Sequence, residues 1–138
     1  MADEAALRAK ARNKEAQKAE REQEKKAIGE KISRLKEAEK KVKAEKKTIK
    51  TLKKEVYKQR DPDKTQWDGD MKNKYKGYVE TSFKNEYETY FGGVDNMHDA
   101  IIRKITELQN EASDLTGLIG ELAKSIKSLW GEIRALFN

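Results

Sequence analysis

The sequence predicts an all-α protein that folds as a long antiparallel helical hairpin. Charged residues make up 41% of its 138 residues, and most of the rest of the composition is typical of long helices and coiled coils. The single proline, Pro62, lies near the middle of the chain, where it ends a helix. On both sides of this proline, apolar residues recur at helical spacing. These three observations favour two long helices joined by one turn.

A single domain over residues 1–138 is expected. Its elements are a first helix over about residues 3–59, a turn over 60–70, and a second helix over about 71–137 with a kink or short break at Gly92–Gly93. In the turn, Gly69 suits a tight reversal and Trp67 is expected to pack back onto the helices. Folding the chain near residue 64 pairs residues whose numbers sum to about 128.

The first helix carries two apolar patterns. Up to residue 27 the apolar face is small and consists of alanines: Ala2, Ala5, Ala9, Ala16 and Ala19. From Ile28 onward one heptad position is always apolar: Ile28, Leu35, Val42, Ile49 and Val56. The alternate position holds Glu39, Lys46 and Lys53 after Ile32, so this helix supplies only half of a coiled-coil seam.

The second helix has the stronger pattern. Aromatic and apolar residues come first at coiled-coil spacing: Phe83, Tyr87, Tyr90, Val94 and Met97. A heptad stripe follows, in which Ile101, Leu108, Leu115, Leu122, Leu129 and Leu136 alternate with Ile105, Ala112, Ile119, Ile126 and Ile133. Ile102, Leu118, Trp130 and Phe137 widen the stripe beyond a two-helix seam. We call the heptad residues from Ile101 to Leu136, together with Ile102, Leu118, Trp130 and Phe137, the apolar stripe.

The apolar stripe is the main indication of function in the sequence. The hairpin places it opposite the alanine-rich residues 1–27, which are too small to cover it. A large uncovered apolar patch marks an interaction site. We therefore expect the stripe to bind a partner helix, with Trp130 included among the contacts, and expect self-association when the partner is absent.

Charge is distributed unevenly along the chain. Residues 1–60 carry 21 basic and 11 acidic side chains, whereas residues 61–138 carry 10 basic and 14 acidic. Ten basic residues lie between Lys40 and Arg60. This face is expected to be solvated and to attract an acidic partner or the other arm. The alternative is a cytoplasmic coiled-coil scaffold or a nucleic-acid-binding protein that uses its lysine-rich first helix, but no basic-region motif leads into a zipper.

Motifs for catalysis, metals and cofactors are not found in the sequence. His98 is the only histidine and there is no cysteine, so a metal site lacks its usual ligands, and His98 is expected to be structural or solvent-facing. The aspartates near the turn lack the glycine and closing glutamate of a calcium loop. We expect a protein that is not an enzyme and binds no cofactor. No apolar run is long enough to span a membrane, and no signal peptide is visible.

The turn and the arms together resemble a known family. Trp67-Asp68-Gly69 in a bend between two long helices is similar to the W-x-G signature of the WXG superfamily. The run Gln66–Gly69, followed by a tyrosine-rich helix and a heptad tail, resembles the YwqH-like small helical proteins associated with LXG-domain toxins. The resemblance covers roughly residues 28–137.

The resemblance implies a targeting factor in Gram-positive bacteria that is not an enzyme. Such a protein binds the helical N-terminal domain of an LXG toxin, with a second small helical protein as a further partner, and promotes export by the type VII secretion machinery. It is then cytoplasmic, or secreted together with the toxin. An aromatic residue followed four positions later by an acid is the family's export motif, and Phe91/Asp95 and Tyr57/Asp61 fit that form, although neither pair is near the C-terminus.

Overall fold

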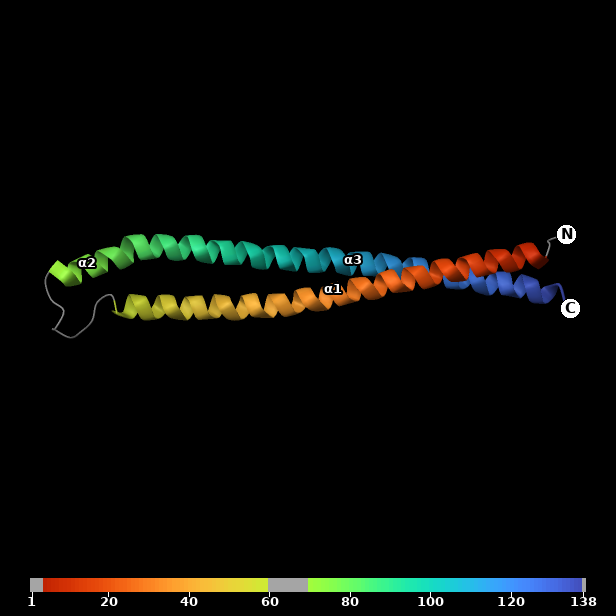
Figure 1. Cartoon of the computed structure of the whole chain (residues 1–138), viewed down its shortest axis with the longest axis horizontal. Coiled ribbons are helices and arrows are strands. Elements are labelled where there is room, and N and C mark those ends of the chain that lie inside the picture. Colours follow the sequence, from red (N-terminus) through yellow and green to blue (C-terminus); the bar gives the residue numbers. More distant parts are fainter. Residues whose placement is uncertain (1–3, 60–69, 138) are drawn as a thin grey trace. The chain divides into compact units, whose positions relative to one another are not determined.

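The computed structural model describes residues 4–59 and 70–137, except for the side chains of Gln59 and Asp70. The described elements are α1 (Glu4–Gln59), α2 (Asp70–Tyr78), the π-helix η1 (Val79–Phe83) and α3 (Lys84–Ala135). Every element in these ranges is helical (Figure 1), and the predicted all-α class is confirmed.

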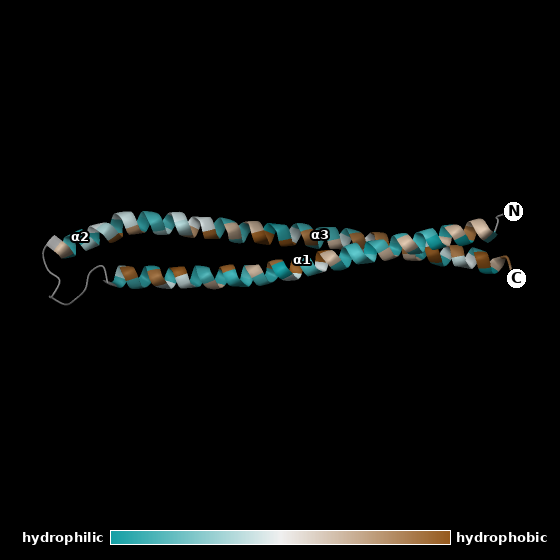
Figure 2. Ribbon diagram, viewed as in Figure 1, coloured by the Kyte–Doolittle hydropathy of each residue, from teal (hydrophilic) through white to brown (hydrophobic). Residues whose placement is uncertain are grey.

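The chain forms two compact units. Unit 1 comprises Met1–Leu35 and Lys104–Asn138, and unit 2 comprises Lys36–Arg103. The helices α1 and α3 contribute to both units, and within each unit the two chain segments pack antiparallel, which confirms the helical-hairpin pairing. Hydrophobic residues recur all along α3, whereas hydrophilic residues dominate α1 (Figure 2).

Unit 1 has an apolar core at the beginning of α1 and the end of α3. Leu7, Ala11 and Ile133 are buried there, and Leu129 and Trp130 pack against them. Ile133 is only 2% exposed. The apolar area that these side chains remove from water is the main force that holds this end of the unit together.

The face of α1 that packs in unit 1 differs from the predicted one. Ala5, Ala9, Ala16 and Ala19 are exposed, whereas Leu7 and Ala11 are buried. Leu7 lies three heptads before Ile28, so the buried face continues the stronger heptad pattern backwards along the helix. The prediction that the alanine face packs against the second helix was therefore wrong. The heptad phase decides which side of α1 faces α3, and the number of alanines does not.

Among the described residues, unit 2 buries fewer apolar side chains than unit 1. These are Val42 on α1, Val79 in η1 and Val94 on α3, and His98 on α3 is buried with them. Three valines and a histidine make a small core. Contacts of lysine side chains with aromatic rings add to the packing of this unit.

The register within unit 2 also differs from the predicted one. Tyr57 contacts Phe83, Lys53 lies over Tyr87, and Lys46 binds Asp95, so facing residues have numbers that sum to about 140 and not 128. The prediction placed the reversal on the turn residues alone. The side chains that fit together set the register instead. On the second arm, α2 comes before the first of these three contacts.

The irregular turn of the second arm is η1, and not the predicted position at Gly92–Gly93. Helix α3 runs through both glycines as regular α-helix, without a break. In η1 the backbone N–H of Lys84 reaches the carbonyl of Val79, five residues back, and the hydroxyl of Thr81 donates to the carbonyl of Gly77 at 2.7 Å. A π-turn changes the phase of the helix that follows. Here it buries Val79 completely.

Candidate partner-binding surfaces

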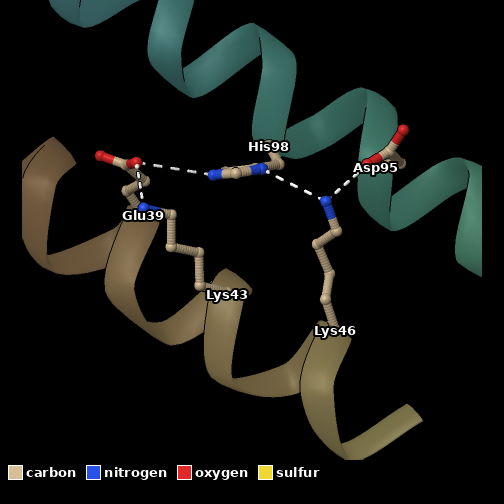
Figure 3. A network of polar contacts seen from close by, with 5 residues as sticks. All are labelled: Glu39, Lys43, Lys46, Asp95 and His98. Carbon is tan, nitrogen blue, oxygen red and sulfur yellow. Dashed lines mark hydrogen bonds and ion pairs between the residues drawn. The ribbon is translucent and has the colours of Figure 1, made fainter. Parts of the chain in front are cut away.

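A polar network joins α1 to α3 inside unit 2 (Figure 3). Lys46 Nζ lies 2.5 Å from Asp95 Oδ1 and 3.4 Å from His98 Nδ1. Nε2 of His98 lies 3.5 Å from Glu39 Oε1, within ion-pair distance, but has no hydrogen-bond partner among the described residues. The buried His98 thus has a structural place between two α1 side chains.

The charges of this network lower the pKa of two carboxyl groups. The hydrogen bond from Lys46, followed by its positive charge, lowers the pKa of Asp95. The hydrogen bond from Lys43 is the largest cause of the lowered pKa of Glu39, which His98 also lowers. Both carboxyl groups are therefore held in the charged form. The contacts of Asp95 with Lys46 and of Glu39 with His98 thus each include a negative charge.

Aromatic rings and lysines form a ladder beside the polar network. Tyr57 meets Phe83 edge to face at 6.2 Å between centroids, and Tyr87 stacks on Phe91 at 5.6 Å. The ammonium of Lys53 lies 4.6 Å from the centroid of Tyr87. Similar contacts join Lys46 and Lys50 to Phe91, and Lys53 to Tyr57. Sequence reasoning missed this ladder, although Lys46 and Lys53 at seam positions of α1 were its signal.

The candidate export pair Phe91/Asp95 lies one turn apart on α3, within unit 2. Both residues contact α1: Phe91 lies under the ammonium groups of Lys46 and Lys50, and Asp95 binds Lys46. Tyr57 of the second pair belongs to the aromatic ladder, while Asp61 lies outside the described residues. The turn residues Trp67 and Gly69 also lie outside them.

The apolar stripe of α3 divides into an inner and an outer set. Ile105, Leu108, Leu115 and Ile133 are buried, so this inner set is covered, whereas the prediction left the stripe uncovered. Partly covered residues follow: Ile101, Ala112, Ile119, Leu122, Ile126 and Leu129. The outer set is exposed: Ile102, Leu118, Leu136 and Phe137. Only the outer set and the partly covered residues leave apolar surface for another molecule.

Trp130 of the stripe makes contacts within unit 1. Its indole N–H donates to Glu15 Oε1 at 2.8 Å, and the guanidinium of Arg8 lies 5.8 Å from the ring centroid. A tryptophan whose indole N–H is hydrogen-bonded can bury its ring between neighbouring helices and fix how they pack. This residue therefore joins α1 to α3.

The described residues contain neither a cluster of metal ligands nor a membrane-spanning helix. Nowhere in 4–59 and 70–137 do three or more histidine, cysteine, aspartate or glutamate side chains gather in a way that could hold a metal ion. Within the same ranges, no helix is long and apolar enough to cross a membrane.

Comparison with known proteins identifies the family. The search of curated proteins and the search of solved structures each returned no match. A family model for YwqH-like proteins matches residues 9–130, which is most of the chain and includes both units. The chain therefore belongs to the YwqH-like family.

Proposed function

We propose that this protein is a non-enzymatic targeting factor that binds the helical N-terminal domain of an LXG-type toxin and promotes its export by a type VII secretion system. Membership of the YwqH-like family supports a partner role. The W-x-G sequence at Trp67–Gly69 supports a place in the wider WXG group. In this proposal the protein binds the toxin in the cytoplasm and presents the helical complex to the secretion machinery.

The exposed outer set of the apolar stripe is the observation that carries the proposal. In unit 1, Leu118 and Leu136 are each 46% exposed and Phe137 is 66% exposed, in a chain that is 41% charged. Fully burying a side chain of this size stabilises a complex by about 1.5–3 kcal/mol. Leu118, Leu122 and Leu129 follow helical spacing along one side of α3, and Leu136 continues this spacing just after the helix, so a helix from another protein fits beside them.

The division of the stripe decides which substitutions test this proposal. Leu115 is buried inside unit 1, so a charge there damages folding and reports nothing about a partner. Leu118→Glu and Leu136→Glu alter exposed positions and leave the core intact. Leu52, which is 54% exposed on α1 in unit 2, offers a matched leucine-to-glutamate control away from the stripe.

The experiment is co-expression with a candidate LXG-type toxin from the same genome, followed by affinity capture on the tagged toxin domain. Wild type and Leu52→Glu should be retained, whereas Leu118→Glu with Leu136→Glu should lose most of the binding at unchanged helix content. Capture of the double variant at the wild-type level, or no capture of the wild type, would contradict the proposal.

We propose Phe91 and Asp95 as the export signal, with Tyr57 and Asp61 as the alternative pair. Phe91→Ala should reduce secretion of the toxin without reducing its capture. Lys46→Met serves as the control, because it removes the α1 side chain that contacts both residues while leaving the pair itself unchanged. Equal loss of secretion in the two variants would mean that only the stability of unit 2 matters.

A further inference from the structure

Unit 2 carries a pocket with an apolar floor and a basic rim. Its volume is about 570 Å³, and the residues that line it are Lys50, Lys53, Lys54, Tyr57, Lys58 and Tyr87. The rings of Tyr57 and Tyr87 lie 5.5 and 4.6 Å from the ammonium of Lys53. We call this feature the lysine–tyrosine pocket.

The rim of the pocket is a row of exposed lysines on one side of α1. Lys50, Lys54 and Lys58 follow each other at four-residue steps, so the row extends about 12 Å along the helix. Lys54 and Lys58 form no ion pair with any acidic side chain in residues 4–58 and 71–137. The pocket therefore suits an apolar side chain that has carboxylates on both sides.

The chain itself presents such a group in unit 1. Leu118 is 46% exposed on α3. Glu111, Asp114 and Glu121 lie seven and four residues before it and three residues after it, and all three acids are exposed. These spacings place the acids and the leucine on the same side of a helix. The acids extend over about 15 Å, which matches the length of the lysine row.

We propose that this protein self-associates by inserting Leu118 of one copy, with its flanking acids, into the lysine–tyrosine pocket of a second copy. The leucine covers the tyrosine floor, and Glu111, Asp114 and Glu121 approach Lys50, Lys54 and Lys58. Opposite charges around an apolar anchor favour one register over others. Each copy carries both surfaces, so the contact is heterologous.

The pocket is less suited to nucleic acid. The lining contains no arginine, the side chain that contacts phosphate in a bidentate way. A helix with carboxylates at helical spacing matches both the lysine row and the apolar floor.

Sedimentation velocity of the purified protein at several concentrations tests the proposal, in about 50 mM and about 500 mM NaCl. Wild type should associate in the low-salt buffer and dissociate in the high-salt buffer. The variant Lys50→Glu/Lys54→Glu/Lys58→Glu and the variant Glu111→Lys/Asp114→Lys/Glu121→Lys should each weaken association at least tenfold. An equimolar mixture of the two should associate again, because the unchanged acids of the first variant meet the unchanged lysines of the second, and the new lysines of the second meet the new glutamates of the first.

A control and two opposing outcomes make the test decisive. Lys25→Glu/Lys26→Glu/Lys31→Glu changes the net charge by the same amount at exposed positions of α1 in unit 1 and should associate like the wild type. A monomeric wild type, or equal loss of association in this control, would overturn the proposal. Saturable retention of DNA or RNA at about 150 mM salt that the Lys50 triple variant abolishes would assign the pocket to nucleic acid instead.

The test is separate from the proposed toxin binding, because it uses this protein alone. The Lys50 triple variant leaves Leu118, Leu136 and Phe137 unchanged, so it should still capture the toxin domain. If the Lys50 triple variant loses self-association but still captures the toxin domain, both proposals are supported. Capture by the variant with Leu118→Glu and Leu136→Glu tests toxin binding only.

Discussion

Unit 1 and unit 2 use the same two helices but are held together by different interactions. Unit 1 relies on buried aliphatic side chains, with Leu7, Ala11 and Ile133 at the centre and Trp130 beside them. Unit 2 has a small valine core, and lysines of α1 lie over the aromatic rings of the second arm. Apolar burial depends little on salt, whereas charged contacts are screened by it. The two units should therefore respond differently to mutation, salt and pH.

The largest expected effect is in the core of unit 1. Ile133→Ala should lower the free energy of unfolding by about 2–5 kcal/mol, because it leaves a cavity at a fully packed position. Urea unfolding followed by circular dichroism measures the change, and added salt should not alter it. Leu136→Ala, at an exposed position directly after the end of α3, is the control and should change stability by about 0.5 kcal/mol or less. Equal effects of the two would mean that unit 1 lacks the described core.

In unit 2, Lys53 contacts two aromatic rings. Lys53→Met keeps the apolar stem but removes the charge over Tyr57 and Tyr87, and each such contact contributes about 0.5–1 kcal/mol. The loss should therefore be about 1–2 kcal/mol and should shrink at high salt. Lys54→Met, whose side chain is exposed on the pocket rim, provides the comparison and should change little. If both methionine variants unfold at the same urea concentration, the cation–π ladder does not stabilise unit 2.

Acid should weaken unit 2 through Asp95. The hydrogen bond and charge of Lys46 lower its pKa in the folded protein below the ordinary value of 3.8. The stabilisation is therefore present above pH about 4 and is lost as the pH falls through the folded pKa. Thermal melts from pH 6 to 2 should show a smaller acid-induced decrease for Asp95→Asn than for wild type. Identical acid dependence in the two proteins would exclude Asp95 as a source.

The smallest effect is expected at high pH. The O–H of Tyr90 donates to Glu45 at 2.9 Å, and this hydrogen bond, followed by the charge of Glu45, raises the pKa of Tyr90 above 10.0. The bond stabilises unit 2 below pH 10 and is lost as the pH rises through the raised pKa. NMR of the Tyr90 ring across the alkaline range should show that it ionises at lower pH in Glu45→Gln than in wild type. An unchanged titration of Tyr90 would contradict the assignment.

The sequence predicted the helices better than it predicted which residues meet. The heptad positions of Ile105, Leu108, Leu115 and Ile133 identified the buried side of α3, because aliphatic periodicity follows burial directly. The buried side of α1 near Leu7 was missed, because Lys14 and Arg21 occupy the heptad positions between Leu7 and Ile28. Both side chains are half-buried, as long charged residues are when their stems lie along apolar surface.

The register and the candidate surfaces needed coordinates for a different reason. Turn residues indicate where a chain reverses, but the pairing of Tyr57 with Phe83 follows from rings and lysines that fit together across the helices. The π-turn at Val79–Phe83 depends on a backbone hydrogen bond, for which this sequence has no distinctive composition. The division of the apolar stripe at Leu115 and Leu118 depends on the exact coverage by α1.

Residue-resolved hydrogen exchange at about 20 mM and about 500 mM NaCl tests the difference between the units most directly. If charged contacts hold unit 2, amide protection over residues 40–58 and 83–98 should fall at the higher salt concentration. Protection over residues 7–15 and 126–133 should stay the same, because it depends on apolar burial. An equal loss of protection in both units, or a loss confined to unit 1, would contradict this account.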